Sequence, residues 1–452
     1  MKHYDAAVIG GGILGCFAAR NLRRYNISTL LVEKEEDVCR GVTRANSAIV
    51  YAGYDNRVGS LKAQMTLKAN RGFSALCDEL EIAFSRCGSL MVSFTPEGDT
   101  AIRKKLKAGE ENAVPGLKLL SGKEALDMEP MLSPDISLAL FAPSTGTVNP
   151  WQLGIAAWEN ATAMGCDTML NTGLLGIEKS TEGYVLKTNR EEISCRALIN
   201  CAGLFADRVQ ELLFEPTVRL FCDGADFIVL DKHAKKPGRI IFHQDAEHGK
   251  GITAIPTTEG NLLLGPSRRP VTGSLWASSK EGLDFLRRDA ERILPGVETD
   301  MCIRSFAGPR PNPHRVVLRD GEYVPDGSSI GSFVIERPEP GFISFIGIKT
   351  PGITCAQELG MYAARAVAEY LNAEERRDFD GGRKAIVRRD ERDIVCRCES
   401  VTRGQILEAI KRGAGSVEAV KRRVGSGMGP CQGSRCTIEI ERMLEDYRDG
   451  KL

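Results

Sequence analysis

The sequence lacks an excess of charge of either sign and lacks any long apolar run. Its 452 residues include 60 Lys and Arg and 60 Asp and Glu, so the formal net charge is zero. This balance gives no reason to expect nucleic acid or an anionic membrane surface as a partner. No apolar run approaches the roughly 18 residues that span a bilayer, so we expect no transmembrane segment. Residues 6–15 are apolar but rich in glycine, which favours a strand and turn over a signal peptide.

Histidine is also scarce, with five in the chain, so few imidazoles are available as general bases. Cysteine is abundant in contrast, with 14 residues. Ten of these are scattered singly, as is usual for small core residues in a reducing compartment. We therefore expect a cytoplasmic protein. The other four cysteines lie near the C-terminus with a regular spacing.

The N-terminal residues have the pattern of one βαβ unit. Residues 5–9 are typical of a buried strand, and residues 15–25 have helical periodicity. Residues 28–32 form a second β-branched segment, which ends at Glu33. The sequence between the first strand and the helix is GGGILG, which matches the G-x-G-x-x-G fingerprint of dinucleotide binding.

Each residue of this fingerprint has a physical role. Gly10 makes the tight turn, and Gly12 lets the backbone approach a pyrophosphate at the helix N-terminus. Gly15 allows the helix to pack closely on the strand, and Glu33 is expected to bind the ribose hydroxyls. These residues alone leave NAD open as an alternative to FAD.

The rest of the chain predicts two or three domains in an α/β fold. Two later segments resemble buried strands that end in glycine, and the stretches between them alternate in polarity like antiparallel strands. We expect a discontinuous Rossmann-like domain over residues 1–75, 145–215 and 325–372, interleaved with a mostly antiparallel α+β substrate domain over residues 76–144 and 216–324.

The C-terminal part differs in composition. Fourteen of the 21 residues from 373 to 393 are charged, which is typical of a solvated segment or a linker. We expect a charged linker over residues 373–392 and a separate small helical domain over residues 393–452.

Residues 41–54 identify a family. Together with residues 59–63 they resemble the flavin-contacting segment of the D-amino-acid-oxidase-like superfamily, which includes glycine oxidase and glycerol-3-phosphate dehydrogenases. Parts of the same stretch are especially similar to L-2-hydroxyglutarate dehydrogenases. Residues 199–207 resemble the second FAD strand of the superfamily, and the resemblance extends over about residues 4–370.

The resemblance implies that FAD is the cofactor and that a small anion is the substrate. Beyond the three glycines and Glu33, the cofactor residues that it implies are Thr43, Asn46, Ser47, Ala202, Gly203, Gly347, Thr350, Gly352 and Ile353.

The four spaced cysteines predict an iron–sulfur site. Cys396 and Cys398 form a CxC pair, and Cys431 and Cys436 form a CxxxxC pair 32 residues later. Four thiolates on two irons meet the usual requirement of a [2Fe-2S] cluster. A four-cysteine zinc site is the alternative, although zinc sites more often use CxxC pairs. Residues 393–445 resemble the bacterioferritin-associated-ferredoxin-like [2Fe-2S] domain, which is also fused to anaerobic glycerol-3-phosphate dehydrogenases and some opine and proline-type dehydrogenases.

The resemblance also implies catalytic residues. Arg310 matches an arginine that binds the substrate anion over the flavin, and Lys349 matches a lysine at the flavin edge in glycerol-3-phosphate dehydrogenases. Tyr51 replaces the histidine that both related families more often have. The general base is left open among His243, Tyr51 and His314.

These features predict an FAD-dependent dehydrogenase of a secondary alcohol, with sn-glycerol 3-phosphate as the expected substrate. Electrons are expected to leave through the flavin and the cluster to an acceptor subunit or carrier. The alternatives are a 2-hydroxyacid dehydrogenase of the L-2-hydroxyglutarate type, an amine or opine dehydrogenase subunit, and an electron-transfer subunit without catalysis of its own.

Overall fold

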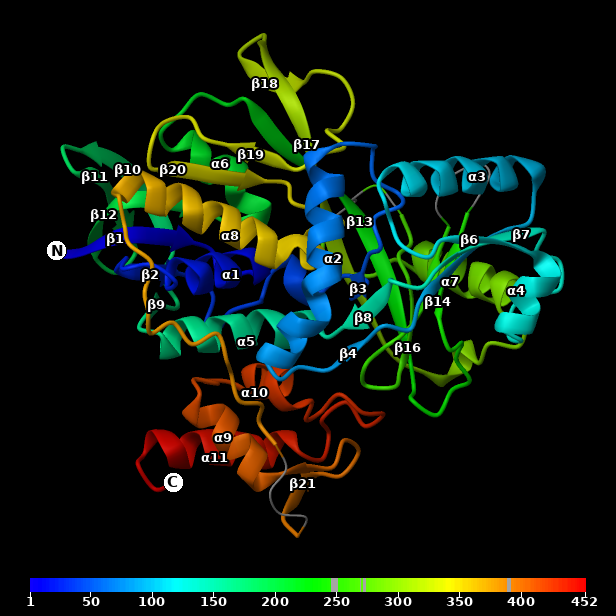
Figure 1. The fold of residues 1–452 in the computed structure, drawn as a ribbon. Helices are drawn as coiled ribbons and strands as arrows, with labels where there is room; N and C mark the ends of the chain where they lie inside the picture. Colours follow the sequence, from blue (N-terminus) through cyan, green and yellow to red (C-terminus); the bar gives the residue numbers. More distant parts are fainter. Residues whose placement is uncertain (245–250, 269, 271–273, 388–391) are drawn as a thin grey trace.

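The chain forms two large sheets and a small C-terminal module (Figure 1). This computed structural model describes residues 1–244, 251–268, 270, 274–387 and 392–452. Within these ranges no helix is long and apolar enough to cross a membrane.

The first sheet contains the predicted βαβ unit. Its central strands β12, β1, β2 and β9 are parallel neighbours, and β20 joins them as a parallel partner of β12. The carboxyl ends of these strands therefore meet at one edge, where α/β proteins bind their ligands. The strands of this sheet are β1 (Lys2–Ile9), β2 (Thr29–Val32), β9 (Asp167–Met169), β10 (Leu174–Ser180), β11 (Gly183–Thr188), β12 (Glu192–Asn200), β19 (Val334–Glu336) and β20 (Phe342–Ile346).

Both faces of the first sheet are buried, which explains its nearly continuous apolar strands. Ala6 and Val8 face a core formed with α1, α5 and α8, whereas Ala7 and Ile9 face a second core on the other side. The helices of these layers are α1 (Ile13–Leu22), α5 (Pro150–Ala163), α6 (Ala206–Glu211) and α8 (Gly352–Leu371).

The second sheet has nine strands in the order β18-β17-β13-β16-β15-β14-β5-β7-β6, and all neighbours except β14 and β5 are antiparallel. This confirms the mostly antiparallel second layer. Its strands are β5 (Ser89–Ser93), β6 (Lys118–Ser121), β7 (Leu138–Ala142), β13 (Val218–Leu230), β14 (Ile240–His243), β15 (Thr253–Pro256), β16 (Leu262–Gly265), β17 (Cys302–Arg319) and β18 (Glu322–Pro325).

Helix α7 packs on one face of the second sheet, and the opposite face turns towards Tyr51 and Tyr54. Helix α2 and a small three-stranded sheet connect the two large sheets (Figure 1). The remaining elements here are α2 (Leu61–Glu79), α3 (Pro96–Glu111), α4 (Gly122–Met128), α7 (Lys280–Ile293), β3 (Ile49–Val50), β4 (Phe84–Ser85), β8 (Gly146–Val148) and the short 3-10 helices η1 (Val42–Arg44), η2 (Gly203–Phe205) and η3 (Thr299–Met301).

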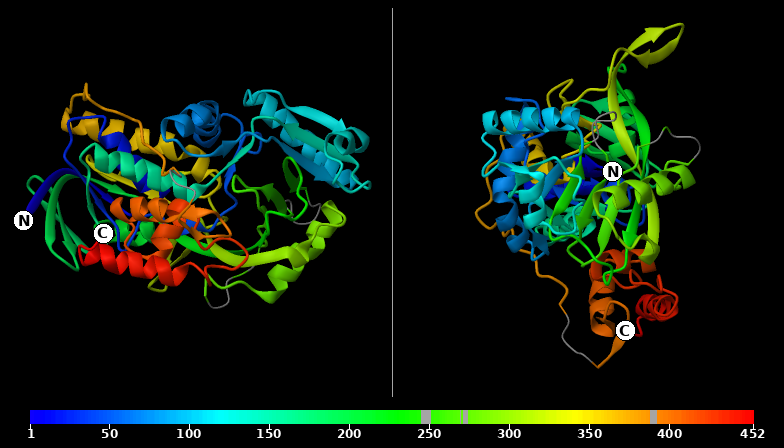
Figure 2. Two further views of the ribbon diagram at one scale, coloured as in Figure 1. Left: turned by 90° about the horizontal axis from the view of Figure 1, so that it is seen from below. Right: turned by 90° about the vertical axis from the view of Figure 1, so that its right-hand side faces the viewer.

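The C-terminal module has its own apolar core and lies beside α5 (Figures 1 and 2). Thr402 and Ser416 cap its first two helices through their side chains, as their positions before apolar periodic stretches favour. The module contains β21 (Ile394–Cys396), β22 (Val401–Thr402), α9 (Arg403–Lys411), α10 (Val417–Val424) and α11 (Thr437–Arg448).

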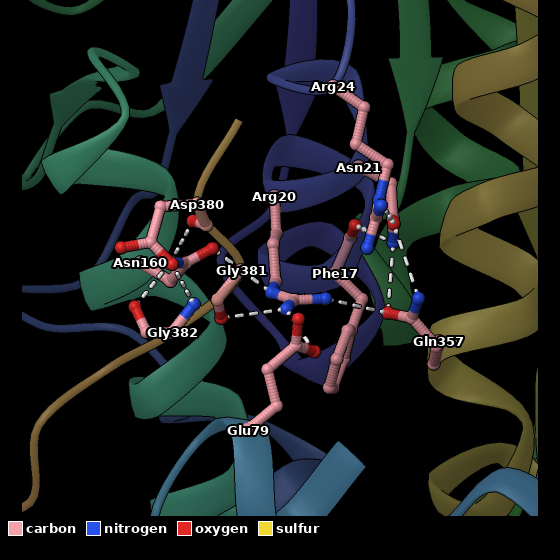
Figure 3. Close-up of polar contacts among 10 residues, drawn as sticks. All are labelled: Phe17, Arg20, Asn21, Arg24, Glu79, Asn160, Gln357, Asp380, Gly381 and Gly382. Atoms are coloured by element: carbon pink, nitrogen blue, oxygen red, sulfur yellow. Dashed lines mark hydrogen bonds and ion pairs between the residues drawn. The ribbon is translucent and has the colours of Figure 1, made fainter. Parts of the chain in front are cut away.

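The charged segment that we expected to be a linker is bound to the first sheet domain by a buried arginine. Arg20, fully buried in α1, donates to the Gly381 carbonyl at 2.9 Å and to Glu79 Oε2 at 2.7 Å. Asn160 of α5 donates to the carbonyls of Asp380 and Gly382, at 2.9 and 2.8 Å. Figure 3 shows these groups converging on the chain between α1 and α5. We call residues 378–385 the strap.

Replacing Arg20 with Met should weaken this attachment. Glu79 and the Gly381 carbonyl then lose their donor, and breaking a buried ion pair costs about 3 kcal/mol of unfolding free energy. Denaturant unfolding followed by release of flavin fluorescence measures the loss, and cleavage of the strap by trypsin should accelerate. The exposed Arg71 of α2, replaced with Met, serves as the control and should change stability by less than about 1 kcal/mol. Equal effects of the two substitutions would contradict the assignment.

Candidate active site and cluster site

The glycine turn after β1 has the close approaches that the fingerprint predicts. Gly10 has φ +102°, and a Cβ there would lie 2.5 Å from the Cys201 carbonyl oxygen. A Cβ on Gly15 would lie 1.8 Å from the Gly10 oxygen, so only glycine lets α1 pack against this turn. In front of Gly12 the space is open, because a Cβ would meet only Thr43 Oγ1, at 3.6 Å. The turn therefore fits a pyrophosphate, which needs direct access to the backbone.

Glu33 ends β2 beside this turn. One carboxylate oxygen accepts the Gly11 amide at 2.5 Å, and the other accepts the Glu35 amide at 2.9 Å. Burial raises the pKa of Glu33 despite these two bonds. The carboxylate is thus held in a fixed orientation at the edge where a ribose would lie.

The predicted flavin segment follows η1. The Asn46 side-chain amide donates to the Val42 and Thr43 carbonyls, and its oxygen accepts the Ala48 amide at 2.8 Å. The Thr43 hydroxyl accepts the Ile13 amide in the first turn of α1, at 3.0 Å. These two side chains therefore shape the segment through its backbone.

The other predicted cofactor residues lie at the same edge. Gly203 (φ +59°) follows β12, and Gly347 (φ +65°) follows β20. The Tyr51 amide donates to Thr354 Oγ1 at 3.0 Å, which attaches the flavin segment to α8. The structure thus brings the predicted residues to the carboxyl ends of β1, β12 and β20: Gly10, Gly12, Gly15, Glu33, Ala202, Gly203, Gly347, Thr350, Gly352 and Ile353.

A cavity of about 370 Å³ lies between the β13–β17 pair and the loop before α8. Arg310 pairs across the strands with Asp223, and Asn312 pairs with Phe221. Because side chains alternate along a strand, Arg310, Asn312 and His314 project from the same face. The cavity is lined by Phe221, Cys222, Asp223, Arg268, Arg310, Asn312, His314, Ser329 and Lys349.

Three cationic side chains face this cavity, with one carboxylate. Lys349 Nζ donates to Asn312 Oδ1 at 3.1 Å and to Ser329 Oγ at 2.9 Å. Burial, together with nearby Arg310, lowers the pKa of Lys349 to about 8. Burial and the charge of Arg268 also lower the pKa of Arg310. Such mutual repulsion is relieved when an anion binds, so the cavity favours an anionic ligand.

Tyr51 belongs to this group, because it interacts with Arg310 and with the side chains of Thr350 and Ser47. Burial raises the pKa of Tyr51 to about 12, so the phenol keeps its proton near neutral pH and acts as a hydrogen-bond donor. His314 lines the cavity and packs edge-on against Phe221, with ring centroids 5.3 Å apart.

His243 lies elsewhere. It bonds Asp289 of α7 at 3.0 Å, on the face of β14 that packs against α7. Phe242, the next residue, is on the opposite face, with its ring centroid 6.1 Å from that of Tyr51. The structure therefore does not bring His243 together with Arg310 and Lys349, and we leave it out of the site.

Sequence reasoning missed Asn312, Ser329 and Asp223. Asn312 also donates to Asp223 Oδ2 at 2.7 Å, so the three polar groups form one network around Lys349. Asn312 follows Arg310 by two residues. Once the strand is recognised, this spacing predicts that the two side chains project from the same face.

The four predicted cluster ligands lie together in two pairs. Cys398 interacts with Cys431, which raises the pKa of the Cys398 thiol, and Cys436 interacts with Cys396. The Gly427 amide points at Cys396 Sγ, 3.4 Å away. A Cβ on Gly429 would lie 2.4 Å from Cys398 Cβ, so glycine is required for this approach.

This arrangement fits a cluster with two irons. Two facing thiol pairs with a backbone amide aimed at sulfur match the requirements of a [2Fe-2S] site.

Comparisons with known proteins agree with both sites. A family model described as FAD dependent oxidoreductase matches residues 5–366. A second model, described as BFD-like [2Fe-2S] binding domain, matches residues 394–446.

Individual relatives cover most of the chain. It is 35% identical over 464 residues to glycerol 3-phosphate dehydrogenase of Caloramator mitchellensis, which covers 98% of this chain and 94% of the relative. It is 28% identical over 312 residues to mitochondrial L-2-hydroxyglutarate dehydrogenase of Homo sapiens, which covers 64% of this chain and 66% of the relative. The solved structure of dithionite-reduced L-alpha-glycerophosphate oxidase from Mycoplasma pneumoniae with FAD bound has the same fold, with a TM-score of 0.73, 22% identity and coverage of 84% and 98%.

The cluster assignment has a direct test. Replacing Cys398 with Ser should remove iron and sulfide from the purified protein and leave the flavin in place, because the two sites lie in separate parts of the chain. Iron content and the visible spectrum measure this. Cys302, whose thiol donates to the Arg304 carbonyl, provides the matched control when replaced with Ser. Full iron content in the Cys398 variant would refute the ligand set.

Proposed function

Because the chain belongs to the FAD-dependent oxidoreductase family and carries a BFD-like [2Fe-2S] domain, we propose that it oxidises sn-glycerol 3-phosphate to dihydroxyacetone phosphate. The observation that carries this proposal is the group of Arg310, Lys349 and Arg268 around one cavity of about 370 Å³. The 35% identical relative named glycerol 3-phosphate dehydrogenase supports the choice of substrate.

In this proposal the cationic residues bind the phosphate group. The planar guanidinium of Arg310 forms paired hydrogen bonds to two phosphate oxygens. Arg268 adds a second positive charge from the loop after β16. The Asp223 carboxylate partly offsets the repulsion between Arg268 and Arg310. The dianionic phosphate thereby fixes the position of the carbon that bears the secondary hydroxyl.

Lys349 and Tyr51 orient the end of the substrate that carries the secondary hydroxyl. Lys349 is fixed by Asn312 and Ser329, so its ammonium group is in place before the substrate binds. Tyr51 keeps its proton and interacts with Arg310, so its phenol is available there as a hydrogen-bond donor. When bound, FAD accepts the hydride and the cluster takes electrons one at a time, which suits delivery to a separate acceptor.

A 2-hydroxyacid is the second candidate substrate. Residues 46–63 resemble the L-2-hydroxyglutarate dehydrogenases, and the human enzyme is 28% identical over 312 residues. A carboxylate fits the same arginine fork as a phosphate. The three cationic side chains around one cavity favour the phosphate, because it concentrates two negative charges on one group, whereas 2-hydroxyglutarate divides them between two carboxylates.

Anaerobic titration of the purified protein tests the proposed substrate. Addition of glycerol 3-phosphate should bleach the flavin band, whereas L-2-hydroxyglutarate should leave it unchanged. The Arg310→Met variant should need at least about a hundredfold more substrate, because it loses a charge-assisted bidentate contact worth roughly 3 kcal/mol. Bleaching by L-2-hydroxyglutarate alone would make the second candidate correct.

The Lys349 ammonium predicts a pH dependence. Its pKa is about 8, so the positive charge is present below that pH and is lost as the pH rises through it. We expect kcat/KM for glycerol 3-phosphate to fall above about pH 8, since this parameter reports the free enzyme. In Lys349→Arg the alkaline fall should vanish from the range up to about pH 10, because a guanidinium stays charged there. An unchanged profile in this variant would assign the fall to another group.

A further inference from the structure

The C-terminal module is fixed to the first sheet domain by a buried ionic contact. Asp37, in the loop after β2, accepts from Arg422 Nη2 at 2.6 Å and from Arg423 Nη1 and Nη2, each at 2.9 Å. Asp37 is fully buried and the two arginines are nearly so. The buried carboxylate accepts three hydrogen bonds from the two guanidinium groups, and breaking such a contact is costly, so it holds the module against the first sheet domain.

The strap fixes the module from a second side. Arg383 of the strap pairs with Glu159 of α5 at 2.6 Å. Arg412, at the end of α9, donates to the Lys384 carbonyl at 2.5 Å and pairs with the same Glu159 at 3.5 Å. The cluster site therefore presents the same surface to solvent whatever the state of the cavity.

Only one side of the cluster site reaches that surface. Cys396 and Cys436 are buried, whereas Cys398 and Cys431 are partly exposed. A redox partner must approach the Cys398–Cys431 side, because electron transfer needs close approach and the other side is covered by the core of the module.

The side chains around this opening are predominantly basic. Arg397 and Arg435 are exposed and adjoin the cysteines in sequence. Lys232 Nζ donates to the Cys398 carbonyl at 3.0 Å, and Arg304 donates to Gln432 Oε1, beside Cys431, at 3.1 Å. Lys421 interacts electrostatically with Arg304. We call these five residues the basic rim: Lys232, Arg304, Arg397, Lys421 and Arg435.

Two acids lie within the rim, and the structure pairs both internally. Glu399 pairs with Lys232 at 3.6 Å, and Glu418 pairs with Lys421 at 3.7 Å. Of the other seven acids of the module, Asp393 and Glu408 lie before α10, and five lie on the last helix, α11, or just after it: Glu439, Glu441, Glu445, Asp446 and Asp449. Since the whole chain has zero net charge, this separation produces a local positive field at the exposed cysteines.

We propose that the basic rim is the docking surface for an acidic one-electron carrier protein, which binds over Cys398 and Cys431. The inference rests on the proposed function, which requires an electron acceptor. Oxidation of one secondary alcohol removes two electrons and two protons. Two molecules of the oxidised carrier each take one electron, and the protons pass to solvent. The rim steers a carrier with a negative face to the exposed cysteines and accelerates its association.

The rim combines residues of two parts of the chain. Arg304 begins β17 and Lys232 follows β13, whereas Arg397, Lys421 and Arg435 belong to the module. The complete docking surface thus exists only while Asp37 and the strap hold the module in place.

The test uses the full holoenzyme and two carriers of opposite charge, an acidic ferredoxin and a basic cytochrome c. Binding of each is measured by calorimetry at about 20 mM and about 200 mM salt. Ferredoxin should bind the wild type more tightly at low salt, and the double variant R397E/R435E should weaken its binding about tenfold or more. The same variant should improve the binding of cytochrome c.

Matched charge reversal on α11 is the control. R442E/R448E changes the net charge equally, at exposed arginines away from the cysteines, and should alter ferredoxin binding by less than about twofold. The proposal is overturned if both double variants weaken ferredoxin binding equally. It is also overturned if the wild type does not bind ferredoxin at low salt.

A second variant separates docking from damage to the cluster. Arg304 lies outside the module, so the R304E variant should retain the cluster even if R397E/R435E loses iron. R304E should also weaken ferredoxin binding, by about threefold. Turnover of glycerol 3-phosphate with a small dye acceptor reports the proposed function independently of docking. If the wild type binds ferredoxin but does not turn over glycerol 3-phosphate with the dye, the proposed function is refuted. If it turns over with the dye but does not bind ferredoxin, the docking surface is refuted.

Discussion

The contact of the Asp37 carboxylate with Arg422 and Arg423 sets the relation between the two halves of the molecule. Burial alone would raise the pKa of Asp37, but the two guanidinium groups outweigh it and hold that pKa below its usual value. Three hydrogen bonds satisfy both oxygens of this buried carboxylate, and breaking a buried ion pair is costly, so the contact favours one position for the module. The loop that carries Asp37 begins at Glu33, next to the glycine turn, and so the same short segment serves both cofactor sites.

The features predicted correctly from sequence are those encoded by neighbouring residues. The turn at Gly10 and the spacing of the four cysteines depend on local backbone geometry. The family models confirm the [2Fe-2S] cluster that the cysteines predicted, and they confirm FAD, which the resemblance of residues 41–54 implied where the glycine turn left NAD open. Arg310 and Lys349 are 39 positions apart, and the resemblance to a family placed them together before any geometry was known. The structure also brings them to one cavity, where their catalytic roles remain proposals.

Other features had no local signal. Residues 37 and 423 are 386 positions apart, and neither segment contains a sequence pattern from which their contact could be predicted. His243 was a candidate because histidine is scarce, but both faces of β14 are apolar and buried, so periodicity did not show which face it occupies. The strap looked like a solvated linker because its charge was visible in the sequence, whereas the buried arginine that binds its carbonyls was not.

The position of Arg20 has a consequence for the order in which the chain matures. Helix α1 is synthesised before Gln357 and Gly381, yet the buried Arg20 guanidinium bonds to both residues. Before these two residues are made, Glu79 and Asn160 can already bond to Arg20, but two of its four hydrogen-bond partners are still missing. The last bonds that fix α1 therefore form only after the strap has been synthesised.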